Sequence, residues 1–506
     1  MTLIHEHLIA LLVVVPLIGA PLCGLLPNTR LPWYLATTIC AGIFFLAALA
    51  LRRVATGEPL HYSLGGWAPP WGIEFRLDVL NALLALLIAS IAFFVVIFSG
   101  PSVRRELRVS RIAGFYAAYL LTLTGLLGIT VTGDVFNLFV FLEISALASY
   151  VMISLSEQRR ALVAAYQYLI LGTIGATFFL IGIGLTYAMT GTLNMADLAT
   201  RLPEAHSTRT VHTAFAFIIV GLAIKFALYP LHQWLPNAYV YAPSAVSALL
   251  AAVATKVAIY ALLRFVFVIF GASFVFNGTP FGWVLLGFAL AAILVGSLIA
   301  SFQSNVKRML AYSSITQIGY IVLGISMLSV MGLTASILHL VNHAIIKATL
   351  FMALGCVFYR LGSINLTRMQ GLGWEMPWTM MAFVIGGLSL IGIPLTAGFL
   401  SKWYLMMAAL DRGWWPVVLF VITATLLATV YIGRVVEAAW LKPAPPGRLK
   451  VREAPLLLLL PTWILALANI YFGVDSRLTL GMASVAASQL LGDTFPGSMG
   501  LVGSLP

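Results

Sequence analysis

The sequence predicts an all-α polytopic membrane protein with about 14 transmembrane helices. Hydrophobic residues make up 61% of the 506 residues and charged residues only 9%, which is far from the composition of soluble domains. Apolar stretches of 18 or more residues recur from one end of the chain to the other, and each is long enough to cross a bilayer as a helix. In two of these stretches a proline lies close to a lysine, at Pro230 and Pro394, which indicates discontinuous helices.

About fourteen spans follow one another along the chain, with ends defined to about 2–4 residues. Several approach thirty residues, which predicts tilt or an unwound break. The breaks are expected in the seventh and twelfth spans, beside the two prolines. The spans cover residues 8–27, 32–51, 78–99, 112–132, 135–155, 161–189, 212–234, 242–271, 281–301, 308–328, 332–359, 378–408, 415–437 and 455–473.

Lysine and arginine predict how these spans are oriented. The odd-numbered loops hold fifteen of these residues, whereas the even-numbered loops and the tail hold seven. Loops rich in lysine and arginine stay on the cytoplasmic side, so both termini are expected outside a bacterial or archaeal cytoplasmic membrane. The net charge of +12 is explained by this bias, and no nucleic-acid partner is expected.

The sequence predicts neither a cofactor nor a metal site. Its three cysteines, Cys23, Cys40 and Cys356, each lie in an apolar stretch at unrelated spacings, which is typical of buried packing residues. No phosphate-binding glycine loop, nucleotide fingerprint, nucleophile elbow or zinc spacing occurs.

Two lysines lie deep inside the interrupted spans, Lys225 close to Pro230 and Lys402 close to Pro394. An ammonium at mid-bilayer depth costs about 2.5–3.5 kcal/mol on insertion scales, so such residues usually mark an ion or proton route. Glu143 is the one acidic residue expected at the centre of a span. A lone carboxylate in hydrocarbon needs a partner, and Lys225 is the natural one.

The eleventh span adds His339, His343 and Lys347, and the eighth adds Lys256. A spacing of four residues places the first three on one helical face, about 6 Å apart per step. Single waters bridge such gaps, and histidine titrates near neutral pH. Together with the pair above, these residues predict a line of proton-transfer groups across the protein.

Each of these residues also has a structural interpretation. One buried lysine is compatible with a static partner or a contact to a neighbouring subunit, and Lys256 with simple binding of backbone carbonyls. His339 or His343 alone is compatible with a hydrogen bond in helix packing. Six such groups with almost no compensating acids favour a functional role.

Six motifs lie in the middle of the chain: the stretch Thr132–Glu143, the stretch Lys225–Tyr239, the Ala-Pro-Ser motif at 242–248, the Lys-Arg motif at 307–315, the histidines at 339 and 343, and the stretch Gly392–Lys402. Together they resemble the antiporter-like subunits of complex I and of Mrp cation/proton antiporters. The resemblance covers residues 75 to 440. The D-type subunits of Mrp-type Na+/H+ antiporters are the branch that the chain resembles best, and subunits of membrane-bound hydrogenases are very similar.

The resemblance implies inverted five-helix repeats, discontinuous helices 7 and 12, and a hydrated lateral axis. It also implies that Glu143 pairs with Lys225, that Lys256 and His343 are the residues that connect this pair to Lys402, and that Lys402 is the terminal proton site. The implied segments are 1–111 with three helices, 112–271 as the first repeat (spans 4–8), 281–437 as the second, inverted repeat (spans 9–13), and 438–506 with the last span and tail.

The implied function is proton translocation within a multi-subunit Na+/H+ antiporter, so the chain is not expected to be an enzyme by itself. The alternative is a proton-pumping subunit of a complex I-like NADH dehydrogenase or membrane-bound hydrogenase, in which case it would be part of a translocase. A third possibility is a scaffold for another subunit's pathway. The expected partners are other membrane subunits of the complex, the lipid bilayer, H+ and, in this chain or in a partner, Na+.

Overall fold

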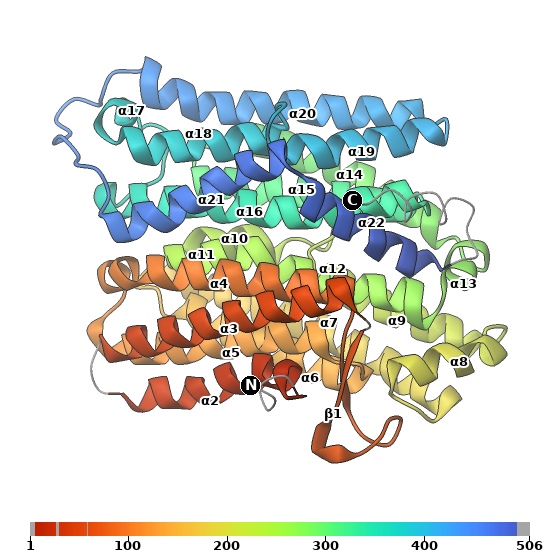
Figure 1. The fold of residues 1–506 in the computed structure, drawn as a ribbon. Helices are drawn as coiled ribbons and strands as arrows, with labels where there is room; N and C mark the ends of the chain where they lie inside the picture. The colour runs from red at the N-terminus through yellow and green to blue at the C-terminus, as the bar shows by residue number, and fades with distance from the viewer. Residues whose placement is uncertain (1–5, 27–29, 58, 493–506) are drawn as a thin grey trace.

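The protein is described by a computed structural model that covers residues 6–26, 30–57 and 59–492. Its long helices lie side by side, with the N-terminal half of the chain forming one part of the bundle and the C-terminal half the other (Figure 1). Residue 27 of the first expected span, and the parts of the expected terminal segments at 1–5 and 493–506, lie outside the described residues.

Twelve helices of the described chain are long and apolar enough to cross a membrane. Two further spans are discontinuous, α9 (Arg209–Lys225) with α10 (Trp234–Tyr241) and α18 (Pro377–Ile391) with α19 (Ala397–Asp411). Twelve and two make fourteen, which confirms the predicted fold and both predicted breaks. The twelve are α2 (Leu8–Leu25), α3 (Leu31–Thr56), α4 (Val79–Glu106), α5 (Ile112–Val131), α6 (Val135–Ser154), α7 (Arg159–Thr190), the span Ser244–Ile269, α14 (Phe281–Ser301), α15 (Val306–Ser326), α16 (Val330–Leu361), α20 (Trp415–Val436) and α21 (Leu456–Val474).

The span Ser244–Ile269 is not a uniform α-helix. Its wider π-helical turns alternate with α-helical ones, and such turns leave carbonyl groups without their usual partners. The segments are α11 (Ser244–Leu249), the π-helical η3 (Leu250–Ala254), α12 (Thr255–Leu263) and the π-helical η4 (Arg264–Ile269).

Shorter elements connect the spans. An antiparallel hairpin follows α3, in which β1 pairs with β2 from Leu60 opposite Leu77 to Ser63 opposite Glu74. The sequence analysis missed these strands, because an alternation of apolar and polar residues over only four residues is a weak signal. The short elements are β1 (Leu60–Ser63), η1 (Leu64–Gly66), β2 (Glu74–Leu77), η2 (Val109–Arg111), α8 (Met195–Ala205), α13 (Ala272–Asn277), α17 (Leu372–Glu375), η5 (Glu437–Leu441) and α22 (Arg477–Leu491).

An inverted repeat relates the two halves. Asp134 begins α6 and forms a β-bridge with Asn194 beyond α7, while Asn305 begins α15 and forms the same bridge with Asn365 beyond α16. The helices α7 and α16 each have 32 residues. Because an odd number of crossings separates α6 from α15, the two units run in opposite directions. The segment limits 112–271 and 281–437 stay a prediction.

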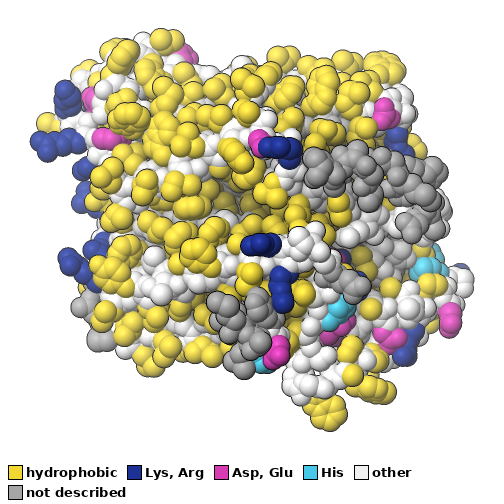
Figure 2. Space-filling view, viewed as in Figure 1, with side chains coloured by type: hydrophobic (Ala, Val, Ile, Leu, Met, Phe, Trp, Pro, Cys, Tyr) yellow, Lys and Arg dark blue, Asp and Glu magenta, His cyan; other side chains and the backbone are white. Residues whose placement is uncertain are grey.

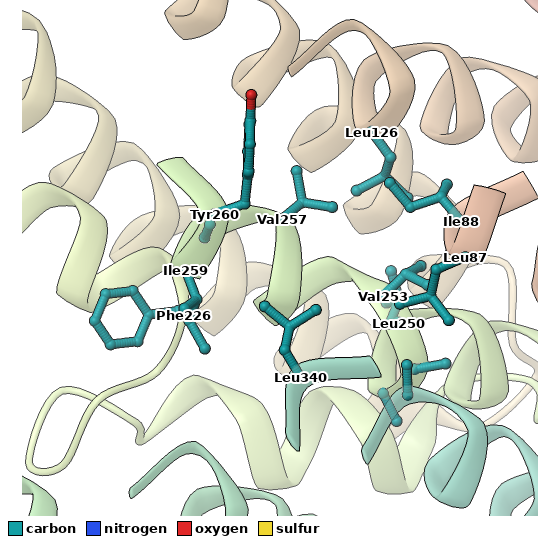
Figure 3. Packing of buried hydrophobic residues seen from close by; sticks show 14 of the residues in the cluster. Leu87, Ile88, Leu126, Phe226, Leu250, Val253, Val257, Ile259, Tyr260 and Leu340 are labelled. Carbon is teal, nitrogen blue, oxygen red and sulfur yellow. The ribbon is translucent and has the colours of Figure 1, made fainter. Parts of the chain in front are cut away.

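The core lies between the two halves. The buried share of the most apolar 18-residue window is 100% in α16 and 94% in both α15 and Ser244–Ile269, but only 33% in α3 and α20. Leu126 of α5, Val257 of α12 and Leu340 of α16 all belong to this core (Figure 3). The central spans are therefore shielded from lipid by protein, and polar groups on them meet protein rather than acyl chains.

Candidate functional site

Glu143 and Lys225 form a buried ion pair between α6 and α9. Lys225 Nζ lies 2.6 Å from Glu143 Oε1, and the lysine and glutamate side chains are 7% and 22% exposed, respectively. The lysine is the last residue of α9, so its head group lies where the helix stops. The predicted pairing of these two residues is present in the structure.

The break after Lys225 is held by side chains of the next segment. The indole nitrogen of Trp234, the first residue of α10, donates to the carbonyl of Ile224 at 2.9 Å. Its ring stacks on Tyr168 of α7, with centroids 3.9 Å apart. Pro230 lies within the non-helical segment between α9 and α10. The chain therefore leaves the helix without leaving the buried environment.

A cavity of about 30 Å³ adjoins Lys225. This volume exceeds the roughly 10–15 Å³ that one water requires. It reaches from Lys225 to α12, because its lining includes Ser145, Ser149, Tyr168 and Ala258. The cavity therefore joins the ion pair to the helix that carries Lys256.

Lys256 lies near the start of α12 and is fully buried. Its Nζ donates to the carbonyl of Ala251 at 2.5 Å, and Ala251 belongs to the π-helical turn η3. The irregular turn thus supplies the acceptor for the ammonium. This contact agrees with both interpretations of Lys256 above.

His339 bridges two elements of the second half. Its Nδ1 lies 2.8 Å from Ser401 Oγ on α19, and its Nε2 lies 3.0 Å from Gln317 Oε1 on α15. The ring stacks with that of His343, with centroids 6.0 Å apart. Neither nitrogen of buried His343 has a hydrogen-bond partner among the described residues. Buried imidazoles usually have one, so His343 is the most available polar group here.

Lys347 and Lys402 are held by oxygen atoms of neighbouring helices. Lys347 Nζ donates to the carbonyl of Leu310 at 2.7 Å and to Ser313 Oγ at 2.6 Å. Lys402 Nζ donates to two backbone carbonyls at 2.8 Å each, those of Leu390 and Ile391 at the end of α18.

The second break supplies the acceptors for Lys402. Pro394 lies in the non-helical segment between α18 and α19, so the last carbonyls of α18 have no partner within their own helix. The C-terminal end of a helix also favours a positive charge. A lysine one turn into α19 therefore meets both an acceptor and a favourable field.

The structure brings the predicted residues into two groups. Glu143 and Lys225 form the first, in the N-terminal half. In the second, His343 lies within electrostatic reach of Lys256, Lys347 and Lys402. The cavity beside Lys225 extends from the first group to α12, the helix that contributes Lys256 to the second.

Sequence reasoning missed the neutral partners of this site, Gln317, Ser313 and Ser401. Serine and glutamine occur in many transmembrane helices, so nothing in the sequence distinguishes those that face a titratable group. No group of three or more His, Cys, Asp or Glu residues able to hold a metal ion occurs within the described chain.

Comparison with known proteins identifies the family of the chain. Residues 132–428 match the family described as NADH:quinone oxidoreductase/Mrp antiporter, transmembrane. This chain belongs to that family. The resemblance seen in its motifs is therefore confirmed.

Relatives of two kinds lie within the family. The chain is 43% identical to the N-type subunit of the NADH-quinone oxidoreductase of Desulforudis audaxviator, over 92% of this chain and 96% of that protein. It is 29% identical to the D-type subunit of the Na(+)/H(+) antiporter of Bacillus subtilis, over 96% and 97%. A chain in the structure of the Mrp complex from Dietzia sp. matches it with a TM-score of 0.89 and 28% identity, over 98% of both chains.

Proposed function

We propose that this chain carries protons along its buried Glu, Lys and His residues as a membrane subunit of a multi-subunit Na+/H+ antiporter. The observation that carries the proposal is the Glu143–Lys225 pair, 2.6 Å apart, with a cavity leading from it towards the helix of Lys256. A structural ion pair has no need of a water-sized space beside it, whereas a proton donor does.

The geometry supports a relay through changing partners. A buried ammonium is stabilised by a carboxylate or by carbonyl oxygens and is destabilised when these move away. Lys225 has the carboxylate of Glu143, while Lys256, Lys347 and Lys402 have carbonyl oxygens. Small shifts of the broken helices would change these contacts and move protons from one amine to the next through His343 and His339.

A second candidate is a proton-pumping subunit of a redox-driven complex. The identity of 43% to a subunit of a NADH-quinone oxidoreductase favours it. In both candidates this chain conducts protons and its partners supply the driving reaction. The proteins that co-purify with the tagged chain distinguish them, because iron–sulfur subunits would support the redox-driven complex and reject the antiporter.

The expected orientation in the cytoplasmic membrane is part of the proposal. Lysine and arginine gather along one edge of the molecule, at one end of the long helices, and an apolar surface covers the side of the bundle in view (Figure 2). Loops rich in these residues face the cytoplasm, which favours termini on the outer side. A cysteine-accessibility assay in intact cells tests this arrangement.

Transport in membrane vesicles tests the proton-carrying role. Lys225→Ala and Glu143→Ala are expected to abolish cation-driven proton movement while the complex still assembles, because each removes one half of the buried pair. Leu449→Ala is the matched control, since Leu449 is 87% exposed and lines neither the ion pair nor its cavity. Normal exchange in both site variants would reject the proposal.

A further inference from the structure

A polar pocket opens on the face that carries the odd-numbered loops, those following α2, α4, α6, α10, α14, α16 and α20. Its volume is about 340 Å³. The ends of α4, α10 and α16 meet the start of α15 here. Its lining includes Glu106, Asn305, Lys307, Phe358 and Ser363.

Lys307 is a buried amine that lines this pocket. It is only 2% exposed, and its Nζ donates to the carbonyl of Ala242 at 3.2 Å and lies 5.5 Å from the centroid of the Phe358 ring. Within the described chain, no carboxylate lies within 4.0 Å of it. A lysine this buried without a directly bound carboxylate is costly, so its retention calls for a role.

Glu106 lies at the same pocket and acts electrostatically on Lys307. Its carboxylate accepts from Ser102 Oγ at 2.6 Å and from the backbone N–H of Ser244 at 2.9 Å. Both donors are neutral, so the charge of Glu106 is not cancelled by a direct ion pair. The residue lines an open pocket, where a proton from water has access to it.

One helix joins this pocket to the buried site. Lys307 and Leu310 are three residues apart on α15, an axial rise of about 4.5 Å. The carbonyl of Leu310 and the hydroxyl of Ser313 are the two acceptors of Lys347 Nζ. The amine of Lys347 therefore binds α15 one turn beyond Lys307.

The opposite face has a pocket of similar size, about 330 Å³, whose charged residues are arranged differently. There Asp78, just before α4, and Arg264, at the end of α12, form a direct ion pair of 2.6 Å. Apolar side chains, among them Leu126 and Val257, lie between the neighbouring helices α5 and α12 (Figure 3). At the opposite face the buried charges are thus paired directly, whereas Lys307 has no directly bound carboxylate within the described chain.

We propose that the pocket of Glu106 and Lys307 is the proton entrance of the buried site, and that Lys347 is the first internal acceptor. This inference rests on the proposed function and adds its point of entrance. A proton passes from water to the Glu106 carboxylate, then to the neutral amine of Lys307, and then to the neutral amine of Lys347. Each donor ends one positive charge lower and each acceptor one higher.

The variant Lys307→Arg distinguishes a proton-carrying role of Lys307 from a purely structural one. Arginine keeps the positive charge and a donor for the carbonyl of Ala242, but it does not release its proton. The variant complex, reconstituted in proteoliposomes, is expected to assemble normally and to move protons about tenfold or more slowly. Transport at the wild-type rate would overturn the role of Lys307.

Blocking the pocket tests the entrance by a second route. Ser363→Cys, labelled from the odd-loop side with a membrane-impermeant thiol reagent, is expected to stop transport. Leu449→Cys on the same face is the control, because its side chain is 87% exposed and it does not line the pocket. The native cysteines are buried. Full transport after complete labelling of Ser363→Cys would reject the entrance.

The two proposals fail separately. If Lys225→Ala and Glu143→Ala both transport normally, the proposed function is wrong. If Lys225→Ala stops transport while Lys307→Arg and labelled Ser363→Cys retain it, the function holds and the entrance lies elsewhere.

Discussion

The buried pair of Glu143 and Lys225 makes an unequal prediction for its two partners. At 2.6 Å, two unit charges attract by about 6 kcal/mol at an effective dielectric constant near 20. Desolvation offsets much of this energy. The cost of breaking the pair therefore depends on which charge is left behind and how well water reaches it.

Removing the acid should cost more than removing the base. Glu143→Gln leaves the Lys225 ammonium, 7% exposed, without a carboxylate, and a buried unpaired charge costs about 3–5 kcal/mol. Lys225→Met leaves a carboxylate that is 22% exposed and reachable by water, so we expect a smaller loss of about 1–3 kcal/mol. The double variant should lose less than the sum of the two.

Unfolding of the purified protein in mixed detergent micelles measures these differences as free energies of unfolding. The wild type, the two single variants and the double variant form a double-mutant cycle, which isolates the interaction of the two residues. Equal losses in the single variants, or losses that simply add in the double variant, would refute the view that burial of Lys225 governs the pair.

Two further predictions concern other parts of the fold. A Cβ at Gly398, at the start of α19, would overlap the carbonyl oxygen of Ser389. Gly398→Ala is therefore expected to abolish assembly or transport in vesicles. Gly433→Ala is the control and should change neither, because a Cβ there meets nothing within 4 Å. Burial is the largest influence on the pKa of Asp78 and would raise it, but the charge and hydrogen bond of Arg264, the backbone N–H of Asn81 and the charge of Arg76 together hold it below the ordinary value of 3.8. This carboxylate therefore adds stability above about pH 3.8 that is lost as the pH falls through its folded-state pKa. Asp78→Asn should lower the unfolding free energy at pH 7 by about 1–3 kcal/mol and remove that acid-side loss.

The sequence was sufficient for the spans, both breaks and the partner of Glu143. Long apolar stretches allow few other folds, and a single mid-span carboxylate leaves little choice of counter-ion. These inferences depended on the composition of one segment at a time, which a sequence displays directly.

The sequence did not predict contacts between segments that lie far apart along the chain. Lys307 lies between the predicted spans 281–301 and 308–328, so it is one of the fifteen loop residues that predict the orientation, yet the structure buries it to 2% exposure. Its burial depends on α10 and α16, which pack against α15. The π-helical turn at Leu250–Ala254 was missed for a related reason, because alanine, valine and leucine fit an α-helix equally well.

Three of the buried lysines lie where the helical backbone is irregular. Lys256 takes its acceptor from a π-helical turn, Lys402 takes two from the end of α18, and Lys225 ends α9 itself. In a regular helix each interior carbonyl already accepts an N–H of its own helix, so an ammonium has to share it, as Lys347 shares that of Leu310. If the breaks served only to bend helices, the lysines would have no reason to coincide with them. Their coincidence indicates that unwound backbone replaces water around the buried charges, so that any movement of the breaks also changes how firmly each amine holds its proton.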